Sequence, residues 1–149
     1  MYKCTDVANY FLKSQDFDSG EFITNLKLQK LLYYAQGIYL ALKDKPLFSE
    51  EIKAWDNGPV CVPLFHMYKH LESDPIPIPE DVDVSETFTK EDREIIDKVY
   101  DYYGQFSAWK LRDMSHEDDI WIKAYKKSKG VISHDEMRKY FKTQLEDDE

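Results

Sequence analysis

The chain has 149 residues, of which 42% are hydrophobic, enough to bury one core and too many for a disordered protein. Its net charge of −9 argues against general nucleic-acid binding, because contacts with phosphate need a basic surface. The longest nearly apolar stretch, 31–42, is shorter than the about 20 residues of a membrane span, and two cysteines are too few for a disulfide framework. Together with an N-terminus that lacks a signal-peptide pattern, these features predict a cytoplasmic protein with a single domain at 1–145 and a frayed acidic tail at 146–149.

The first quarter of the chain predicts a short helix followed by a central one. Thr5 is expected to cap the first helix. Between 26 and 43, apolar residues recur at three- and four-residue intervals on one face and at seven-residue intervals on another, so this helix is expected to be buried almost all round. Thr24 or Asn25 can cap it, and Gly37 in its middle indicates the close approach of another backbone.

A small β element is expected directly after the central helix. Residues 52–55 predict a short strand, and 56–59, with the sequence Asp-Asn-Gly-Pro, form a strong turn signal. Pro63 suits the first turn of a helix at 64–71. The proline- and acid-rich stretch 73–86 is expected to be an extended, exposed connection.

The remaining chain predicts further helices, each with its own start signal. These signals are Thr89, Ser107, Ser115 and Ser133. Two of the three tryptophans are expected to be largely buried, because large aromatics usually anchor a core. The predicted fold class is mainly α (small α+β): a single helical domain around a buried central helix, with a short β element after it.

The usual catalytic signatures are absent, so no catalytic residue, cofactor or metal site is predicted. His66 and His70 have a spacing that can hold a metal, but no third ligand lies near them in sequence. His116 with the acids at 117–119 could perform acid–base chemistry. The alternative is that these acids mark the N-terminus of a helix.

Gln29 and Gln36 lie on the same face of the buried central helix, although a buried amide needs hydrogen-bond partners. Either they bind the backbone of a packed loop, or their face lines a groove that receives another molecule. Charge is also unevenly distributed. Residues 72–101 hold eleven acidic and three basic side chains, whereas 121–143 hold seven basic and two acidic ones. These stretches are either solvated faces, or the acidic one steers a basic protein partner.

Several stretches together resemble one family, the Panacea or SocA-like antitoxin domain, over roughly 23–141. The matching stretches are Leu28-Gln29-Lys30-Leu31-Leu32-Tyr33-Tyr34-Ala35-Gln36, Ile52 to Trp55, Asn57-Gly58-Pro59-Val60, Ser107-Ala108-Trp109-Lys110-Leu111, and Ser115-His116 with Trp121. Two departures from the family pattern are Ser115 in place of threonine and Ile120 in place of proline. A third is the acidic turn at Asp56-Asn57, where the family often has Arg-His.

The resemblance implies a protein-binding antitoxin, common in prophages and mobile elements, that neutralises a toxin by direct contact. One family member instead acts as an adaptor that delivers its toxin to a protease. By this resemblance the chain is no enzyme, and its partner is a toxin or another protein. The residues expected to bind this partner are Gln29, Lys30, Gln36, Trp55, Asp56, Asn57, Gly58, Pro59, His116 and Trp121. Two alternatives are a hydrolase or nucleotide-modifying enzyme that uses His116 and nearby carboxylates, and a phage-associated regulatory protein whose partner is not a toxin.

Overall fold

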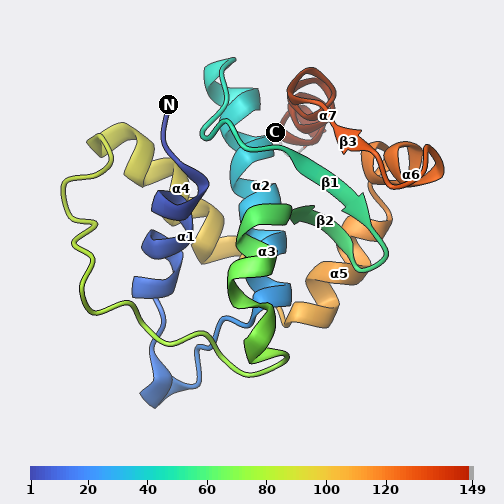
Figure 1. The fold of residues 1–149 in the computed structure, drawn as a ribbon. Coiled ribbons are helices and arrows are strands. Elements are labelled where there is room, and N and C mark those ends of the chain that lie inside the picture. The colour runs from blue at the N-terminus through green and yellow to red at the C-terminus, as the bar shows by residue number, and fades with distance from the viewer. Residues whose placement is uncertain (148–149) are drawn as a thin grey trace.

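The structure, a computed structural model, describes residues 1–147 and is mainly helical, with a small antiparallel sheet on one side (Figure 1). This confirms the predicted fold class. The α-helices are α1 (Cys4–Lys13), α2 (Asn25–Lys43), α3 (Val62–Tyr68), α4 (Lys90–Tyr103), α5 (Ala108–His116), α6 (Asp119–Lys126) and α7 (His134–Asp147). The strands are β1 (Ile52–Trp55), β2 (Gly58–Cys61) and β3 (Val131–Ile132), and the short 3-10 helices are η1 (Phe17–Ser19) and η2 (Lys69–Leu71). Helix α7 continues past the predicted tail boundary at 145, and residues 148–149 of that tail lie outside the described residues.

Helix α2 is the centre of the fold, as predicted (Figure 1). It packs against α1, α3, α4, α5, α7 and β2, whereas α6 packs on β1 and β3. The Thr24 hydroxyl accepts a hydrogen bond from the backbone N–H of Lys27 and so caps its start. Asp44 ends it in the left-handed conformation, with φ of 58°. The predicted burial of α2 is confirmed from Leu28 to Ala41, with Ile38 half-buried. Leu42 was expected on the inward face but is 53% exposed, although Leu40 and Ala41 in the same turn are buried.

Glycine is needed at position 37 because a side chain of another helix packs against it, and not, as predicted, because another backbone does. A Cβ atom built on Gly37 would lie 2.1 Å from the nearest ring atom of Phe141 in α7. The two helices can therefore approach this closely only because position 37 has no side chain. The Phe141 ring also packs edge-on against Tyr33, with 5.4 Å between the ring centroids.

The sheet has the strand order β2-β1-β3, with both neighbours antiparallel to β1. Trp55 pairs with Gly58, so the hairpin loop consists of only Asp56 and Asn57, and the predicted four-residue turn is wrong in its second half. Pro59 lies in β2, an edge strand, where its missing N–H leaves no hydrogen bond unmade in the sheet. Strand β3 is not predicted from the sequence, because two residues are too few to show alternation.

Two of the predicted helix starts are wrong. Helix α1 begins at Cys4, so Thr5 lies inside it, and the Asp6 carboxylate accepts a hydrogen bond from the backbone N–H of Lys3. Ser115 does not start a helix, because α5 continues through it to His116. Its hydroxyl donates to the carbonyl of Arg112, which leaves Asp118 as the N-cap of α6.

The connection predicted at 73–86 contains no helix or strand, and in the structure this irregular segment runs from 72 to 89, but it is anchored to the core. The backbone N–H of Ile76 donates to the carbonyl of Ile23 at 2.9 Å, and the Gln15 side chain donates to the carbonyl of Ile76 at the same distance. Ile76 and Phe88 are both buried. The acidic side chains between them therefore project from a segment that is fixed at both ends.

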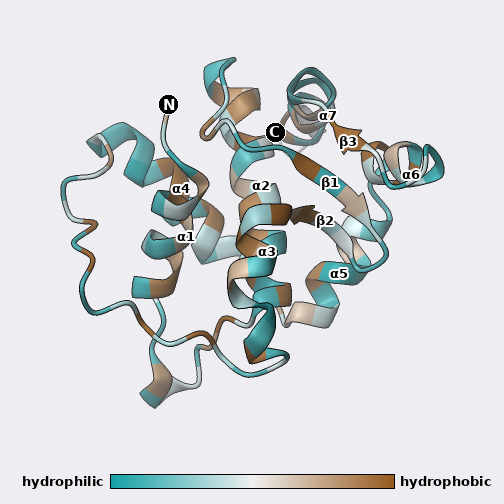
Figure 2. Cartoon of the chain, viewed as in Figure 1, coloured by the Kyte–Doolittle hydropathy of each residue, from teal (hydrophilic) through white to brown (hydrophobic). Residues whose placement is uncertain are grey.

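Two of the three tryptophans, Trp55 and Trp121, are largely though not fully buried, as predicted, whereas Trp109 is 61% exposed. None of the three is among the fully buried residues of the core. The core is filled instead by aliphatic side chains and by rings such as Tyr33. Figure 2 shows the hydrophobic colour along β2 and β3, while the outward turns of α4, α6 and α7 are largely hydrophilic. Among the described residues, no helix combines the length and the apolar character needed to cross a membrane.

Candidate partner-binding site

The hairpin turn between β1 and β2 is the centre of the predicted binding residues. Gly58 has φ of 107°, a conformation that side chains rarely adopt. A Cβ atom at this position would lie 2.7 Å from both Cε of Lys30 and Oγ of Ser115. The turn can therefore lie directly on α2 and α5 only with glycine at 58.

Helices α5 and α6 hold the turn through two aromatic rings. The His116 ring stacks on Trp121, with 4.2 Å between the centroids, and its Nε2 lies 2.9 Å from the carbonyl oxygen of Asp56. Because a carbonyl can only accept, this Nε2 carries a hydrogen. The indole N–H of Trp121 donates to the carbonyl of Trp55 at 3.1 Å. Burial lowers the pKa of His116, and the nearby Arg112 adds to this effect, so the ring is neutral at pH 7.

Charged side chains fix the two residues of the loop itself. The Asp56 carboxylate accepts a hydrogen bond from the Tyr125 hydroxyl and lies 3.1 Å from Nζ of Lys129. The hydrogen bonds from Tyr125 and Lys129 lower the pKa of Asp56. Nε of Arg112 donates to the side-chain oxygen of Asn57 at 3.0 Å. The acidic turn that departs from the family pattern is thus paired with cations from α5 and from the segment after α6.

Lys30 lies beneath the hairpin and is only 2% exposed. Its Nζ donates to the carbonyl oxygen of Pro59 at 2.9 Å. Burial, and to a lesser extent the charge of Arg112, lowers the pKa of Lys30 to about 7. The amine therefore holds the hairpin on α2 while it is close to losing its proton.

Gln29 and Gln36 both bind backbone groups of packed segments, which is the first of the two alternatives considered for this pair. Oε1 of Gln29 accepts from the N–H of Cys61 at 2.8 Å. Oε1 of Gln36 accepts from the N–H of Leu47 at 2.8 Å, and its Nε2 donates to the carbonyl of Phe48 at 2.7 Å. Each amide thus attaches one segment to α2, Gln29 the end of β2 and Gln36 the segment before β1.

A cleft of about 530 Å³, here called the hairpin cleft, opens between the N-terminal half of α2, the hairpin and α3. It is lined by Asn25, Leu26, Gln29, Lys30, Trp55, Asp56, Asn57, Gly58, Val60, Phe65, Lys69, Glu72, Trp109 and Lys129. Six predicted residues line it: Gln29, Lys30, Trp55, Asp56, Asn57 and Gly58. Pro59, His116 and Trp121 support the turn without lining the cleft, while Gln36 lies further along α2 against 47–48.

Phe65 and Trp109 line the hairpin cleft and Arg112 lies beside it, although none of the three is among the predicted binding residues. The Arg112 guanidinium lies over the Trp109 ring, 5.3 Å from its centroid. Their spacing of three residues on a helix is the one signal that could have identified this pair. Phe65 packs edge-on against Trp55, and only the structure brings these two residues together.

The arrangement around His116 does not form an acid–base pair. Asp118 accepts hydrogen bonds from the hydroxyls of Tyr33 and Tyr140, at 2.8 Å and 2.6 Å, and burial raises its pKa. His116 instead bonds to the backbone of Asp56. Among the described residues, no group of three or more histidine, cysteine, aspartate or glutamate side chains could hold a metal ion.

Comparison with known proteins gives one family and one curated relative. The family model described as "Antitoxin SocA-like, Panacea domain" matches residues 28–122, which is shorter than the 23–141 expected from the resemblance. Antitoxin SocA of Caulobacter vibrioides is 53% identical over 38 residues, 26% of this chain and 20% of that protein. The match therefore spans about a fifth of that relative's length. No solved structure matches the chain.

The matched range covers the structural centre of the candidate site. It runs from α2 through the hairpin to α5 and the start of α6, and so includes Lys30, Gly58, His116 and Trp121. Since it also spans more than half of the chain, the chain belongs to the SocA-like antitoxin family with a Panacea domain.

Proposed function

We propose that the chain is an antitoxin that neutralises a protein toxin by direct contact and performs no catalysis of its own. Family membership over 28–122 is the observation that carries this proposal. The site supports it, because His116 and Asp118 are each committed to separate structural hydrogen bonds. The proposal places the protein in the cytoplasm, where its two free cysteines, Cys4 and Cys61, would remain reduced.

The hairpin cleft is the surface proposed to contact the toxin. Its walls include Trp55, Phe65 and the exposed Trp109, and aromatic side chains of this kind contribute much of the energy of protein interfaces. The loop residues Asp56 and Asn57 are held in place before any partner arrives. A surface that is already ordered loses little conformational entropy on binding.

Co-expression with the product of the neighbouring reading frame tests the proposal. The wild type is expected to restore growth in cells that produce this protein and to co-purify with it. Trp109→Ala with Asn57→Ala removes two exposed groups of the hairpin cleft and is expected to weaken binding at least tenfold. Met67→Ala, a 50% exposed residue of α3 outside the cleft, is the matched control and is expected to bind like the wild type.

Three other results have distinct meanings in this experiment. Growth rescue with a falling toxin level would indicate delivery to a protease, the adaptor mechanism known in this family. Binding without growth rescue would favour a regulatory protein with a non-toxin partner. A hydrolytic or nucleotide-modifying activity of the wild type that His116→Ala abolishes, while binding is retained, would favour the enzyme and contradict the proposal.

A further inference from the structure

Two buried cysteines from distant parts of the chain meet at the end of the hairpin. Cys4 is the first residue of α1 and is 1% exposed, while Cys61 ends β2 and is fully buried. Both are free thiols, and the Cys4 thiol donates a hydrogen bond to the sulfur of Cys61. Neither residue lines the hairpin cleft.

Backbone contacts hold the two cysteines beside each other. The N–H of Cys4 donates to Oε1 of Glu50 at 3.2 Å, and Cys61 pairs with Ile52 in β1. The short stretch 50–52 therefore positions both of them. The N–H of Cys61 also donates to Oε1 of Gln29, which attaches the end of β2 to α2. Thiols that are already in contact need only a small further approach to form a disulfide.

The two thiols differ in acidity. The hydrogen bond from Cys4 lowers the pKa of Cys61, although burial opposes this effect. The same hydrogen bond raises the pKa of Cys4, and burial and the Glu50 carboxylate add to the increase. The thiolate is the reactive form of cysteine, so Cys61 is the attacking sulfur and Cys4 keeps its proton for a second step.

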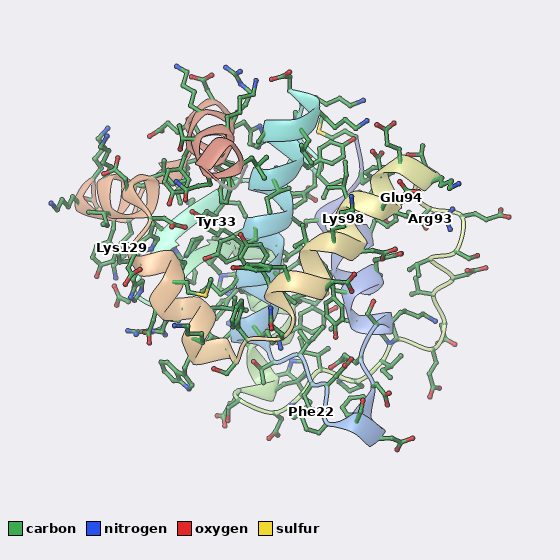
Figure 3. All side chains as sticks on the ribbon, turned by 180° about the vertical axis from the view of Figure 1, so that it is seen from behind. Phe22, Tyr33, Arg93, Glu94, Lys98 and Lys129 are labelled. Atoms are coloured by element: carbon green, nitrogen blue, oxygen red, sulfur yellow. The ribbon has the colours of Figure 1, made fainter. Side chains whose placement is uncertain are left out.

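The surroundings of the pair select a small oxidant. Figure 3 shows side chains packed around α2, with Tyr33 among them. Glu50, which is bonded to Cys4, is only half-buried, so water lies one side chain away from the pair. Hydrogen peroxide is little larger than water and suits this position, whereas a disulfide such as oxidised glutathione is too large to reach either sulfur.

We propose that Cys4 and Cys61 form an oxidation site at which hydrogen peroxide converts the two thiols into an intramolecular disulfide. The Cys61 thiolate attacks one peroxide oxygen, so that an S–O bond forms, the O–O bond breaks and the departing hydroxide takes up a proton to become water. The Cys4 sulfur then attacks the sulfenic acid of Cys61. The S–S bond forms, the S–O bond breaks, and the hydroxyl leaves with the Cys4 proton as a second water. Two electrons pass from the thiols to one peroxide.

This proposal goes beyond neutralisation of a toxin and does not depend on it. In a reducing cytoplasm the pair rests as two thiols, and disulfides that form in that compartment are usually transient and redox-sensing. The disulfide would join α1 to the end of β2, which Gln29 attaches to the wall of the hairpin cleft.

The test treats the full chain, in its native state, with a small excess of hydrogen peroxide, and catalase ends the reaction. Remaining thiols are alkylated in urea, and intact mass and peptide mapping identify the products. The expected product has lost two hydrogen atoms, takes up no alkyl group and contains a peptide that joins Cys4 to Cys61. Dithiothreitol is expected to restore both thiols. Met67, which is 50% exposed, is the internal measure of exposure to peroxide, because its sulfoxide appears in the same map.

Two matched variants test the roles of the two sulfurs, and circular dichroism compares their folds with that of the wild type. Cys4→Ser removes the second thiol, so the sulfenic acid of Cys61 is expected to accumulate and to be trapped by dimedone. Cys61→Ser is expected to give at least tenfold less dimedone adduct, because Cys4 keeps its proton. Equal trapping in the two variants would overturn the assignment of Cys61 as the attacking sulfur.

Three results with the wild type would overturn the proposal, whether or not the variants fold. Thiols that remain fully alkylated after Met67 is oxidised would mean that peroxide does not reach the pair. Disulfide-linked dimers would mean that the reaction occurs between molecules. Sulfinic acid without a crosslink would mean that the two sulfurs do not meet. None of these measurements involves a toxin, so failure here leaves the proposed function intact.

Discussion

Nζ of Lys30 lies 2.9 Å from the carbonyl oxygen of Pro59, in a position from which water is almost completely excluded. A protonated amine at such a site has lost its hydration, and this cost is the reason that the pKa of Lys30 falls to about 7. The contact that holds the hairpin on α2 therefore makes the stability of the protein depend on pH.

Lys30→Met is expected to abolish part of this pH dependence. The folded protein releases the Lys30 proton near pH 7, whereas the unfolded chain keeps it up to about pH 10.5, so the folded state binds fewer protons between these values. Stability of the wild type should therefore rise with pH in this window, by up to about 1.4 kcal/mol per pH unit from this group. Urea unfolding at pH 6, 7, 8 and 9 measures the free energy of unfolding of both proteins. The free-energy difference between Lys30→Met and the wild type should shift steadily in favour of the wild type above pH 7, and parallel curves would disprove the explanation.

Leu31→Ala is expected to destabilise the fold by about 2–5 kcal/mol, because it leaves a cavity beside a fully buried position of α2. Leu42→Ala is a matched control on the same helix, since the Leu42 side chain is 53% exposed. Leu42→Ala should lower the free energy of unfolding by less than about 0.5 kcal/mol. Denaturation in urea compares the two variants, and similar losses for both would show that α2 does not form the core as described.

Gly37→Ala is expected to cost about 1–3 kcal/mol, because the new methyl group would collide with the Phe141 ring. Phe141→Leu removes the ring edge and provides space for that methyl group. In a double-mutant cycle, the loss in Gly37→Ala with Phe141→Leu should be smaller than the sum of the two single losses. Strict additivity would mean that the two helices relax apart at this position.

Local patterns predicted α2, its Thr24 cap and the start of the hairpin, because each depends on residues close together in sequence. They could not predict strand β3, which forms only by pairing with β1 across more than seventy residues. Ser115 is a similar case: its motif matches a helix start, but in the fold its hydroxyl lies against Gly58 of the hairpin and the residue stays within α5. Long-range contacts decided both cases.

The sequence predicted many of the residues of the candidate site, but it predicted less well what each of them does there. The sequence identified Gln29 and Gln36 as buried amides that require partners, and both bind backbone groups. It could not show that Trp109 lies exposed at the hairpin cleft. A pattern of apolar residues reports which side chains avoid water on average, and an exposed indole at a binding surface is an exception that only the fold reveals.

The acidic connection before α4 is expected to accelerate binding to a basic toxin without contributing much to the stability of the complex. Glu80, Asp81 and Glu86 are exposed on this connection, within a segment whose ends are fixed by Ile76 and Phe88. Charges at the rim of an interface mainly affect the association rate. Reversing all three to lysine should therefore lower the on-rate, and the difference from the wild type should shrink as salt is raised.

Asp83 is left unchanged in this variant, because its carboxylate accepts hydrogen bonds from the N–H and the hydroxyl of Ser85 and shapes the connection locally. Surface-based kinetics against the neighbouring gene product, at two salt concentrations, measure both rates. The off-rate should change less than twofold, since the contacts that hold the complex lie in the hairpin cleft under the proposed function. The Asn57→Ala and Trp109→Ala double variant should do the reverse, raising the off-rate while leaving the on-rate and its salt dependence nearly as they are. An on-rate that responds neither to charge reversal nor to salt would mean that the acidic residues of 72–101 form only a solvated face.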